Sequence, residues 1–503
     1  MVSGLLSLVV WIPIAGLVVL LALPRGQVRA IRVVALVTTL ADFLASVWAA
    51  AAFDFSQAGT LQLTEQTRWI PSLGVTYHLA ADGLSLPLVL LTTILTVLCV
   101  IYSWRVDLRP KEYMILFLLL ETGMLGVFLA LDFFLFYVFW EVSLIPMYFI
   151  IGIWGGPRRI YAAIKFFLYT LVGSLAMLLS ILIVYFHSSP RTFDMVALFQ
   201  QKPLAGDLHL AVLAFWGFFL AFAIKVPMFP FHTWLPDAHV EAPTAGSVLL
   251  AAILLKLGTY GFVRILLPLL PAAFHALAGM VAVLAAIAAV YGALVAMAQT
   301  DLKKLVAYSS VNHMGYVMLG VAAAAAAQGQ PALRNAATIA LNGATMQMLA
   351  HGVITGALFF LVGVIYDYRA HTRGVNDFGG LWERLPVYTG MTMLAMLASL
   401  GLPGLMGFVA EFSIFLGAYQ IYPAFTVAAL AGVVITVAFF LWTIYRIFWG
   451  PLNARWAALP DLDGRETWTL APLAALMIAV GLYPAPLVGT INAAMIEIMS
   501  LVR

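Results

Sequence analysis

The stretch FLAFAIKVPMFPFHTW, residues 219–234, places one lysine and two prolines inside a largely apolar segment. Lys225 stands near its centre, two residues before Pro227. A proline inside a helix removes a backbone hydrogen bond and kinks or breaks the helix. A charged side chain at the bilayer centre is unfavourable by about 2.5–3.5 kcal/mol on the insertion scale. The stretch therefore predicts a broken membrane helix whose lysine functions in moving protons or ions.

The composition of the whole chain is that of a membrane protein. Hydrophobic residues make up 64% and charged residues 9% of its 503 positions. Lipid allows only helices and closed barrels, and the long apolar runs of this chain do not alternate as barrel strands do. The predicted fold class is therefore an all-α polytopic membrane protein. The single cysteine, Cys99, excludes an internal disulfide framework and argues against a cysteine-ligated iron–sulfur cluster.

Turn residues and charges punctuate the apolar runs and predict fourteen transmembrane spans. The predicted limits are 3–23, 29–53, 82–104, 112–130, 133–152, 160–186, 208–235, 242–266, 272–297, 305–326, 338–366, 387–420, 425–449 and 469–494. The first span has no basic region ahead of it and no cleavage site of small residues, so we expect a retained helix rather than a signal peptide. The longest gaps are expected to be connecting loops, at residues 54–81, 187–207 and 367–386.

The basic residues segregate between the two sides of this arrangement. If the loops alternate sides, sixteen Lys and Arg residues fall on one side and six on the other, with Lys165, Lys225 and Lys256 inside helices. The positive-inside rule assigns the side with sixteen to the cytoplasm, which places both termini on the other side. An odd number of spans breaks this segregation, so the charge distribution favours fourteen.

A second interrupted span suggests internal repeats. The twelfth span contains Gly401-Leu-Pro-Gly404 followed by Gly407, so it also carries a proline near its centre. Broken helices five spans apart are typical of transporters built from repeats, and they predict one repeat in helices 4–8 and another in helices 9–13. The predicted segments are a three-helix N-terminal part, two repeats and a last helix, at residues 1–111, 112–266, 267–450 and 451–503.

Glu141 is a candidate partner of the buried lysines. It is the ninth residue of its span, in LFYVFWEVSLIPMYF. A carboxylate at that depth needs a cation nearby because burial disfavours its charged form, and Lys225 and Lys256 are the candidates. One interpretation is a static ion pair that fixes helix packing. However, two lysines for one glutamate leave one lysine without a full counter-charge, which suits a group that takes up and releases protons.

Two histidines and a glutamate extend this set. His313 and His351 lie in the middle of the tenth and eleventh spans, and Glu411 follows the break in the twelfth. A single histidine in a helix is more often a packed residue that is hydrogen-bonded to a neighbour. Because these helices lie in order between those of Lys256 and Glu411, we expect the histidines to relay protons toward Glu411. The alternative for Glu411 is a helix-start carboxylate stabilised by the helix dipole.

The remaining candidates are weaker. Glu121 lies inside the fourth span and is a candidate second carboxylate beside Glu141. Lys165 is close enough to the basic side for packing or membrane anchoring to be an equal alternative to transport. The sequence has no dinucleotide fingerprint, P-loop, cysteine cluster or nucleophile elbow. His232 and His239 flank a Pro-Asp turn without a third ligand nearby. We therefore expect no cofactor, metal or nucleic acid to bind this chain.

Three stretches resemble the antiporter-like membrane subunits of respiratory complex I. They are FYVFWEVSLIPMY (136–148), PFHTWLPDAHVEAPTAGSVLLAAILLKLGTYG (230–261) and YGALVAMAQTDLKKLVAYSSVNHMGY (291–316). The resemblance covers nearly the whole chain, and the family also includes subunits of sodium/proton antiporters and of membrane-bound hydrogenases. Within it, the chain resembles the branch that carries an acidic residue at the position of Glu411, where sister chains usually carry lysine.

The resemblance implies a proton-translocating membrane-arm subunit of an NADH:quinone oxidoreductase in the bacterial cytoplasmic membrane. It implies that Glu141 and Lys225 form a coupling pair, that Lys256, His313 and His351 belong to a central axis, and that Glu411 faces the exit side. Flavin, iron–sulfur clusters and quinone are then expected in partner subunits, with sister antiporter-like chains on both sides. The alternatives are a subunit of a sodium/proton antiporter or membrane-bound hydrogenase, and a scaffold that only spaces other subunits.

Overall fold

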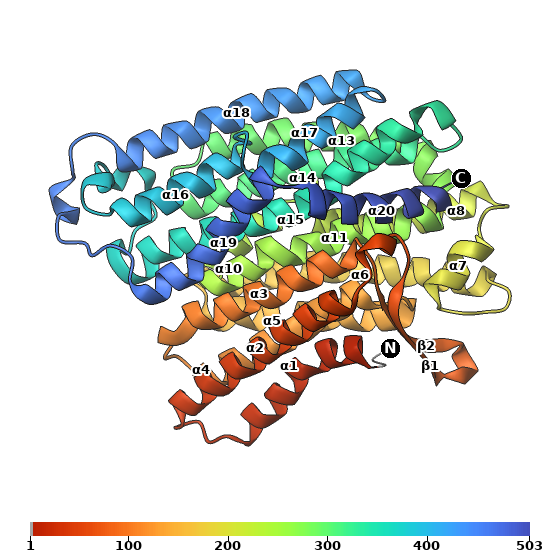
Figure 1. The fold of residues 1–503 in the computed structure, drawn as a ribbon, viewed down its shortest axis with the longest axis horizontal. Helices are drawn as coiled ribbons and strands as arrows, with labels where there is room; N and C mark the ends of the chain where they lie inside the picture. The colour runs from red at the N-terminus through yellow and green to blue at the C-terminus, as the bar shows by residue number, and fades with distance from the viewer. Residues whose placement is uncertain (1–3, 503) are drawn as a thin grey trace.

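Long helices running in a common direction make up most of the computed structural model, which describes residues 4–502 (Figure 1). The first half of the chain forms α1 (Leu5–Ala22), α2 (Val28–Ala52), α3 (Ser85–Tyr102), α4 (Pro110–Leu129), α5 (Phe133–Trp154), α6 (Arg159–His187), α7 (Met195–Gln201), α8 (Leu208–Lys225), α9 (Trp234–Glu241), α10 (Thr244–Leu249), α11 (Leu255–Gly261) and α12 (Leu267–Leu269). The second half forms α13 (Pro271–Met297), α14 (Leu302–Ala326), α15 (Arg334–Ile365), α16 (Pro386–Ser399), α17 (Met406–Tyr419), α18 (Pro423–Phe448), α19 (Gly464–Leu482) and α20 (Ala485–Leu501).

The predicted fold class, an all-α polytopic membrane protein, is confirmed at this level. Within residues 4–502, eleven helices are long and apolar enough to cross a membrane, or twelve if the bent pair α19–α20 is one span. This count includes neither α14 nor the shorter helices α16 and α17. Figure 1 shows the helices ranged from α1 at one edge to α18 at the other, and α1 begins at the same end of the molecule at which α20 stops.

Both predicted helix breaks are present. The first lies between Lys225, the last residue of α8, and Trp234, the first residue of α9. The second lies between Ser399 and Met406, and within it Gly401 and Gly404 have φ angles of 80° and 89°. Only glycine adopts such angles without strain, which explains the Gly-Leu-Pro-Gly sequence at this point.

The expectation of plain connecting loops is wrong at two of the three longest gaps, and the last span is less regular than expected. Residues 54–81 do not form a plain loop, because β1 (Gln62–Ile70) and β2 (Val75–Ala81) pair as an antiparallel hairpin, and the gap 187–207 contains α7. The predicted last span, 469–494, is two helices bent by 76° between α19 and α20. Pro484 at this bend stands inside an apolar run, so hydropathy alone does not reveal it.

The hairpin is fixed to α7 by a buried dyad outside the membrane helices. His78 Nδ1 lies 2.6 Å from Asp194 Oδ2, and Gln66 donates to the same oxygen at 3.0 Å. Burial raises the pKa of Asp194, but the hydrogen bonds from His78 and from the Ala197 N–H outweigh this effect and hold it below its usual value. The carboxylate therefore stays ionised and keeps the hairpin on the bundle.

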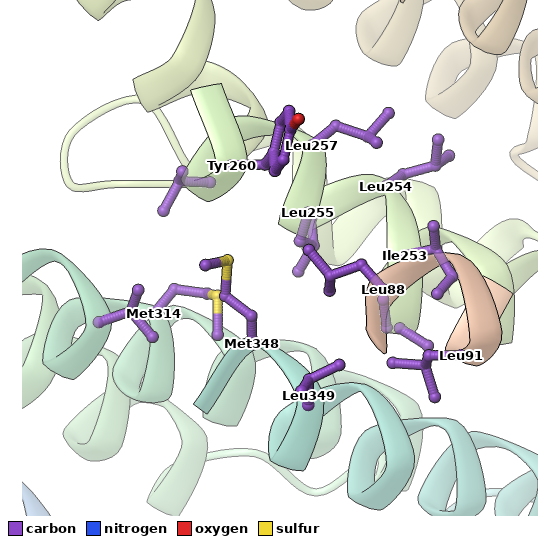
Figure 2. Packing of buried hydrophobic residues seen from close by; sticks show 14 of the residues in the cluster. Leu88, Leu91, Ile253, Leu254, Leu255, Leu257, Tyr260, Met314, Met348 and Leu349 are labelled. Atoms are coloured by element: carbon purple, nitrogen blue, oxygen red, sulfur yellow. The ribbon is translucent and has the colours of Figure 1, made fainter. Parts of the chain in front are cut away.

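The buried core centres on α10–α12 and α15, which are fully enclosed along their most apolar stretches. Figure 2 shows Leu91 of α3, Ile253 of the α10–α12 helix and Met348 of α15 in this core. Small residues allow helices to approach closely: a Cβ at Gly343 of α15 would lie 2.4 Å from the Ile414 N of α17. The core thus brings the α10–α12 helix, α14, α15 and α17 together around the polar groups described below.

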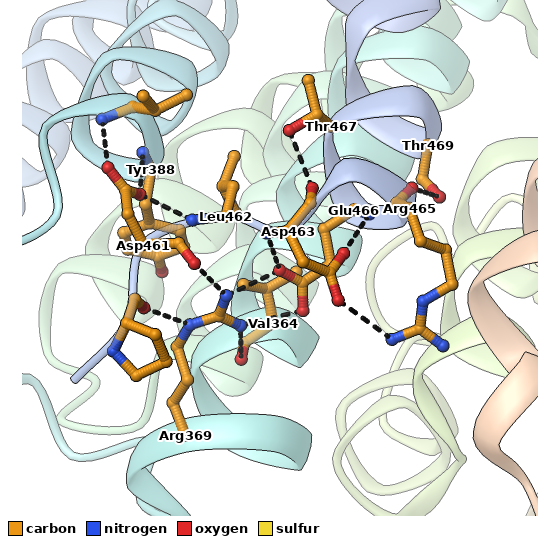
Figure 3. A network of polar contacts seen from close by, with 12 residues as sticks. Val364, Arg369, Tyr388, Asp461, Leu462, Asp463, Arg465, Glu466, Thr467 and Thr469 are labelled. Atoms are coloured by element: carbon orange, nitrogen blue, oxygen red, sulfur yellow. Dashed lines mark hydrogen bonds and ion pairs between the residues drawn. The ribbon is translucent and has the colours of Figure 1, made fainter.

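A polar network fixes α19 to the end of α15 (Figure 3). Arg369, just after α15, donates to both carboxylate oxygens of Glu466 at 2.8 and 2.6 Å. Glu466 also closes a capping box with Asp463 at the start of α19. The Asp461 carboxylate accepts a hydrogen bond from the backbone N–H of Val387 at 2.8 Å. This bond connects the start of α16 to the same network. The network of the ion pair and these hydrogen bonds therefore holds together the ends of α15, α16 and α19.

Glu466→Ala should strongly destabilise the protein. The substitution leaves the Arg369 side chain, 4% exposed, without its counter-charge, and breaking a buried pair typically costs about 3–5 kcal/mol. Thermal unfolding of the detergent-solubilised complex measures the loss. The control is Glu112→Ala, whose partner Arg25 is 82% exposed and which should leave the melting temperature nearly unchanged. Equal shifts in the two variants would contradict this role of Glu466.

Candidate functional site

Lys225 lies at the first helix break in an aromatic enclosure. Its side chain is 1% exposed, and within the described residues its Nζ has no hydrogen-bond partner. The amine lies 5.3 Å from the ring centroid of Trp140 on α5 and 5.9 Å from that of Phe166 on α6. Ring faces attract a cation but do not fix it as a carboxylate does. The position at a helix C-terminus also favours positive charge.

Glu141 lies beside this enclosure without closing an ion pair. It follows Trp140 on α5, is half-buried, and exerts an electrostatic attraction on Lys225. Among residues 4–502, its Oε1 atom has no hydrogen-bond partner, and neither a hydrogen bond nor a salt bridge joins Glu141 to Lys225. Glu141 and Lys225 therefore interact by long-range electrostatic attraction, and the distance between them can change without breaking a hydrogen bond.

Lys256 occupies the centre of the α10–α12 helix between two π-helical turns, Leu250–Leu254 and Phe262–Leu266. Its side chain is fully buried. The Nζ atom donates to Ala251 O at 2.7 Å and lies 2.6 Å from His351 Nδ1 on α15. Such π-helical turns within α-helices are frequent at functional sites. The two turns on either side of Lys256 were not predicted from the sequence.

Lys225 and Lys256 lie on helices that contact each other. A Cβ at Gly258, two residues after Lys256, would lie 2.9 Å from the Val226 N at the end of α8. This close approach places the break after Lys225 directly against the segment that carries Lys256.

His351 is followed by His313 and Glu411. The two imidazole centroids are 5.6 Å apart. His313 Nδ1 lies 3.0 Å from Glu411 Oε1, and Gln347 donates to the same oxygen at 3.1 Å. His313 Nε2 lies 3.2 Å from Ser399 Oγ, at the last residue before the second break.

Lys256, His351, His313 and Glu411 therefore form one continuous set of buried groups, which we call the polar row. It runs from the α10–α12 helix across α15 and α14 to α17. The cavity between its second half and Ser399 is too small to admit a water molecule. Proton transfer along the polar row therefore requires either direct exchange between side chains or a separation of the helices that admits water.

The two secondary candidates lie elsewhere. Lys165 forms an ion pair with Asp237 of α9 at 2.7 Å, and Arg158 contacts the same carboxylate at 3.1 Å. This ion pair within the protein favours the packing interpretation of Lys165. Glu121 of α4 is fully buried, and the carboxyl group that faces it is that of Asp42 on α2.

His239 is a buried group that sequence reasoning considered only as a metal ligand. It is 0% exposed, its ring stacks on Phe359 at 4.6 Å, and in the described chain neither ring nitrogen has a hydrogen-bond partner. Its electrostatic neighbours are Lys303 and Lys256. The signal available in the sequence was a histidine at the end of a broken span, three residues before Ala242-Pro243.

A cavity of about 470 Å³ opens on the same side as the Lys- and Arg-rich loops. Charged residues from distant parts of the chain line it, including Arg105, Glu241, Lys303, Asp367 and Arg373. Lys303 donates from within it to Ala242 O at 2.7 Å. Lys303, which lines this cavity, and Lys256 of the polar row are thus both electrostatic neighbours of His239. Across residues 4–502, no group of three or more His, Cys, Asp or Glu side chains is arranged to hold a metal ion.

Comparison with known proteins assigns the class of protein. Residues 130–436 match the family described as NADH:quinone oxidoreductase/Mrp antiporter, transmembrane. This range contains the Glu141–Lys225 pair, His239 and the whole polar row. The chain belongs to this family of membrane proteins.

Individual relatives narrow the assignment. The chain is 45% identical over 498 residues to NADH-quinone oxidoreductase subunit M of Rhodobacter capsulatus, which covers 96% of this chain and 94% of the relative. Its fold is similar to a chain of respiratory complex I from Thermus thermophilus with bound NADH, at a TM-score of 0.87 and 33% identity, covering 99% and 100% of the two chains. The likeness to subunit M confirms both the family and the branch that the sequence predicted.

A chain of the Mrp complex from Dietzia sp. has the same fold. The TM-score is 0.85 at 21% identity, and the match covers 100% of both chains. At this identity the likeness concerns the fold alone.

Glu411→Ala should destabilise the protein because it removes the acceptor shared by His313 and Gln347. A buried donor left without a partner costs about 1–3 kcal/mol. Glu411→Gln retains the size and one acceptor oxygen and should lose less stability. Thermal unfolding in detergent compares both with Glu497→Ala, an exposed residue of α20. A loss at Glu411→Ala no larger than at Glu497→Ala would show that these contacts are absent in the folded protein.

Proposed function

We propose that this chain is the M subunit of a proton-translocating NADH:quinone oxidoreductase of the bacterial cytoplasmic membrane. The observation that carries the proposal is the polar row, which links Lys256 to Glu411 through His351 and His313. The likeness to subunit M over 96% of the chain supports it. The chain takes part in the enzyme reaction as its translocating subunit.

The membrane topology that fits this function has fourteen spans. The broken pairs α8–α9, α16–α17 and α19–α20 each count as one span, as does the continuous α10–α12 helix. Both termini then face away from the cytoplasm, in agreement with the distribution of Lys and Arg. Spans 4–8 (residues 112–266) and spans 9–13 (residues 267–450) form two repeats, and each repeat contains one broken span.

Proton uptake begins at the cavity on the basic, cytoplasmic side. Lys303 and Glu241 line its inner wall, and His239 lies behind them next to Lys256. A histidine with both nitrogens unpaired can accept a proton on one side and release one on the other. The path from the cavity to the polar row therefore passes through His239.

The Glu141–Lys225 pair controls the row electrostatically. While the Glu141 carboxylate is near, it stabilises the protonated amine of Lys225. When a movement at one end of the membrane arm separates the two groups, the amine loses that stabilisation and its proton moves toward Lys256. A tenfold change in proton affinity corresponds to about 1.4 kcal/mol, so a working pump needs several such factors. The absence of a contact ion pair makes this separation easy.

The far end of the row releases the proton. Lys256 passes it to His351, His351 to His313, and His313 to Glu411 at the second helix break. The two breaks provide the hinge points at which water enters and leaves the path.

The redox chemistry belongs to partner subunits. NADH oxidation and quinone reduction require flavin, iron–sulfur clusters and a quinone site, which we place in other chains of the complex. Sister antiporter-like chains adjoin this one on both sides within the lipid bilayer. The competing function is that of a sodium/proton antiporter or hydrogenase subunit, because the matching family also includes Mrp antiporters. Co-purification of the redox subunits with this chain decides between the two.

Lys225→Ala should abolish proton pumping while the complex still assembles. Among the residues that the structure describes, the Lys225 amine has no hydrogen-bond partner, so the fold should tolerate its removal. In reconstituted vesicles, quinone-linked acidification is expected to fall below about a tenth of the wild-type rate, a barrier change of about 1.4 kcal/mol or more. Lys304→Ala, at the cytoplasmic start of α14, is the control with normal pumping. Full pumping in Lys225→Ala would exclude Lys225 from the mechanism.

His239→Leu should slow proton uptake from the cytoplasmic cavity. The substitution removes the titratable ring but keeps an apolar side chain against Phe359, so the packing should persist. We expect fewer protons translocated per electron pair, with NADH oxidation in uncoupled vesicles nearly unchanged. His209→Leu, at an exposed position of α8, is the matched control. Equal proton-to-electron ratios in both variants would place the uptake path elsewhere.

A further inference from the structure

A second pair of buried acids lies outside the polar row. Asp42 is in the middle of α2 and Glu121 in the middle of α4, and both side chains are 0% exposed. Their carboxyl groups face each other, with Thr96 of α3 beside Glu121. Among the residues that the structure describes, none of the four carboxyl oxygens has a hydrogen-bond partner at standard geometry.

The helices around this pair supply no counter-charge. α1, which packs against both α2 and α4, has no titratable side chain between Leu5 and Ala22. On α3, the Thr96 hydroxyl donates to Thr92 O at 2.9 Å, and the Cys99 thiol is turned toward Ala245 O at 3.6 Å. On α5 the charged group is another acid, Glu141.

The nearest cations on the same helices are distant and engaged. Arg32 precedes Asp42 by ten residues, roughly 15 Å along the helix, and binds Asp107 at 2.7 Å. Lys111 precedes Glu121 by the same interval and donates to Leu23 O at 2.6 Å.

A further cation near this carboxyl pair, Lys256, already has partners in or beside the polar row. Lys256 lies on α11, which contacts α4, but its amine donates to Ala251 O and contacts His351. The carboxyl pair is therefore surrounded by apolar groups, hydroxyls and a thiol.

Two negative charges are not stable in this setting. An unpaired buried charge costs several kcal/mol, and two facing carboxylates also repel each other. One proton placed between them removes a charge and supplies the missing hydrogen bond, as in other pairs of facing carboxyl groups. A hard metal cation fits less well because it takes about six or more oxygen ligands, and the Thr96 hydroxyl is bonded to its own helix.

We propose that Asp42 and Glu121 form a proton-binding site that holds one proton between their carboxyl groups, separate from the polar row. The site lies among α2, α3 and α4, at the junction between the N-terminal three-helix part and the first predicted repeat. It does not depend on the function proposed above, because it follows from the burial and the surroundings of the two side chains.

Infrared spectroscopy of the purified complex in vesicles tests this site. At neutral pH, the wild-type minus Asp42→Asn/Glu121→Gln difference spectrum should contain the carbonyl stretch of a protonated carboxyl group, and this band should shift in D₂O. Carboxylate bands alone in that spectrum, without the protonated band, would overturn the proposal. Asp107→Asn is the matched control: its carboxylate is 88% exposed and paired with Arg32, so its difference spectrum should contain only carboxylate bands.

A second variant covers the case in which the double variant fails to assemble. Asp42→Glu keeps both carboxyl groups and changes only the distance between them. It should shift the frequency of the protonated carbonyl band relative to the wild type. An unchanged band would show that the proton is not held between Asp42 and Glu121.

Discussion

The structure depends on one constraint of lipid, which is that every backbone N–H and C=O group in the membrane must find a partner within the protein. The two helix breaks satisfy it locally. After Lys225, the Val226 N–H bonds to Phe222 O at 2.8 Å, and in the second break the Leu402 N–H bonds to Leu397 O at 3.1 Å. Because these bonds are short-range, each break opens the helix at one point without exposing its backbone. The ionisable groups can then lie beside the breaks, where a small rearrangement changes their surroundings.

The charged groups divide into two kinds by the way they are neutralised. Arg369 and Glu466, at the end of the helices, form a bidentate ion pair that is expensive to break. In the membrane interior, Lys225 has aromatic rings for neighbours, and the amine of Lys256 lies against the imidazole ring of His351. Tight pairs thus stabilise the fold, whereas the interior amines lack such pairs, as the proposed proton exchange at these groups requires. This division is what a proton path requires, and a purely structural set of buried charges would not need it.

Local signals explain what could be predicted from the sequence. The breaks near Pro227 and Pro403 follow from prolines and glycines inside apolar runs, and the residues of the polar row follow from charges at span centres. The hairpin of β1 and β2 was not predicted because β1 is largely polar and lacks the regular alternation of apolar and polar residues that indicates a strand. The facing of Asp42 and Glu121 depends on which helices pack together, as does the position of His239 behind Lys303. Sequence spacing contains no such information for residues on separate helices.

The order of charges along the molecule gives the polar row a direction. Lys225, which lies beside the Lys256 end of the row, carries a positive charge when protonated, and at the other end the Glu411 carboxylate lies 3.0 Å from His313 Nδ1 and accepts a hydrogen bond from Gln347. In a medium of low dielectric constant these charges act over several ångströms, so a proton on His351 or His313 is repelled from the first end and attracted to the second. A lysine in place of Glu411 would reverse the second contribution and leave the row without a sink. Under the proposed function, the acidic residue at position 411 would therefore also set the direction in which the row moves protons.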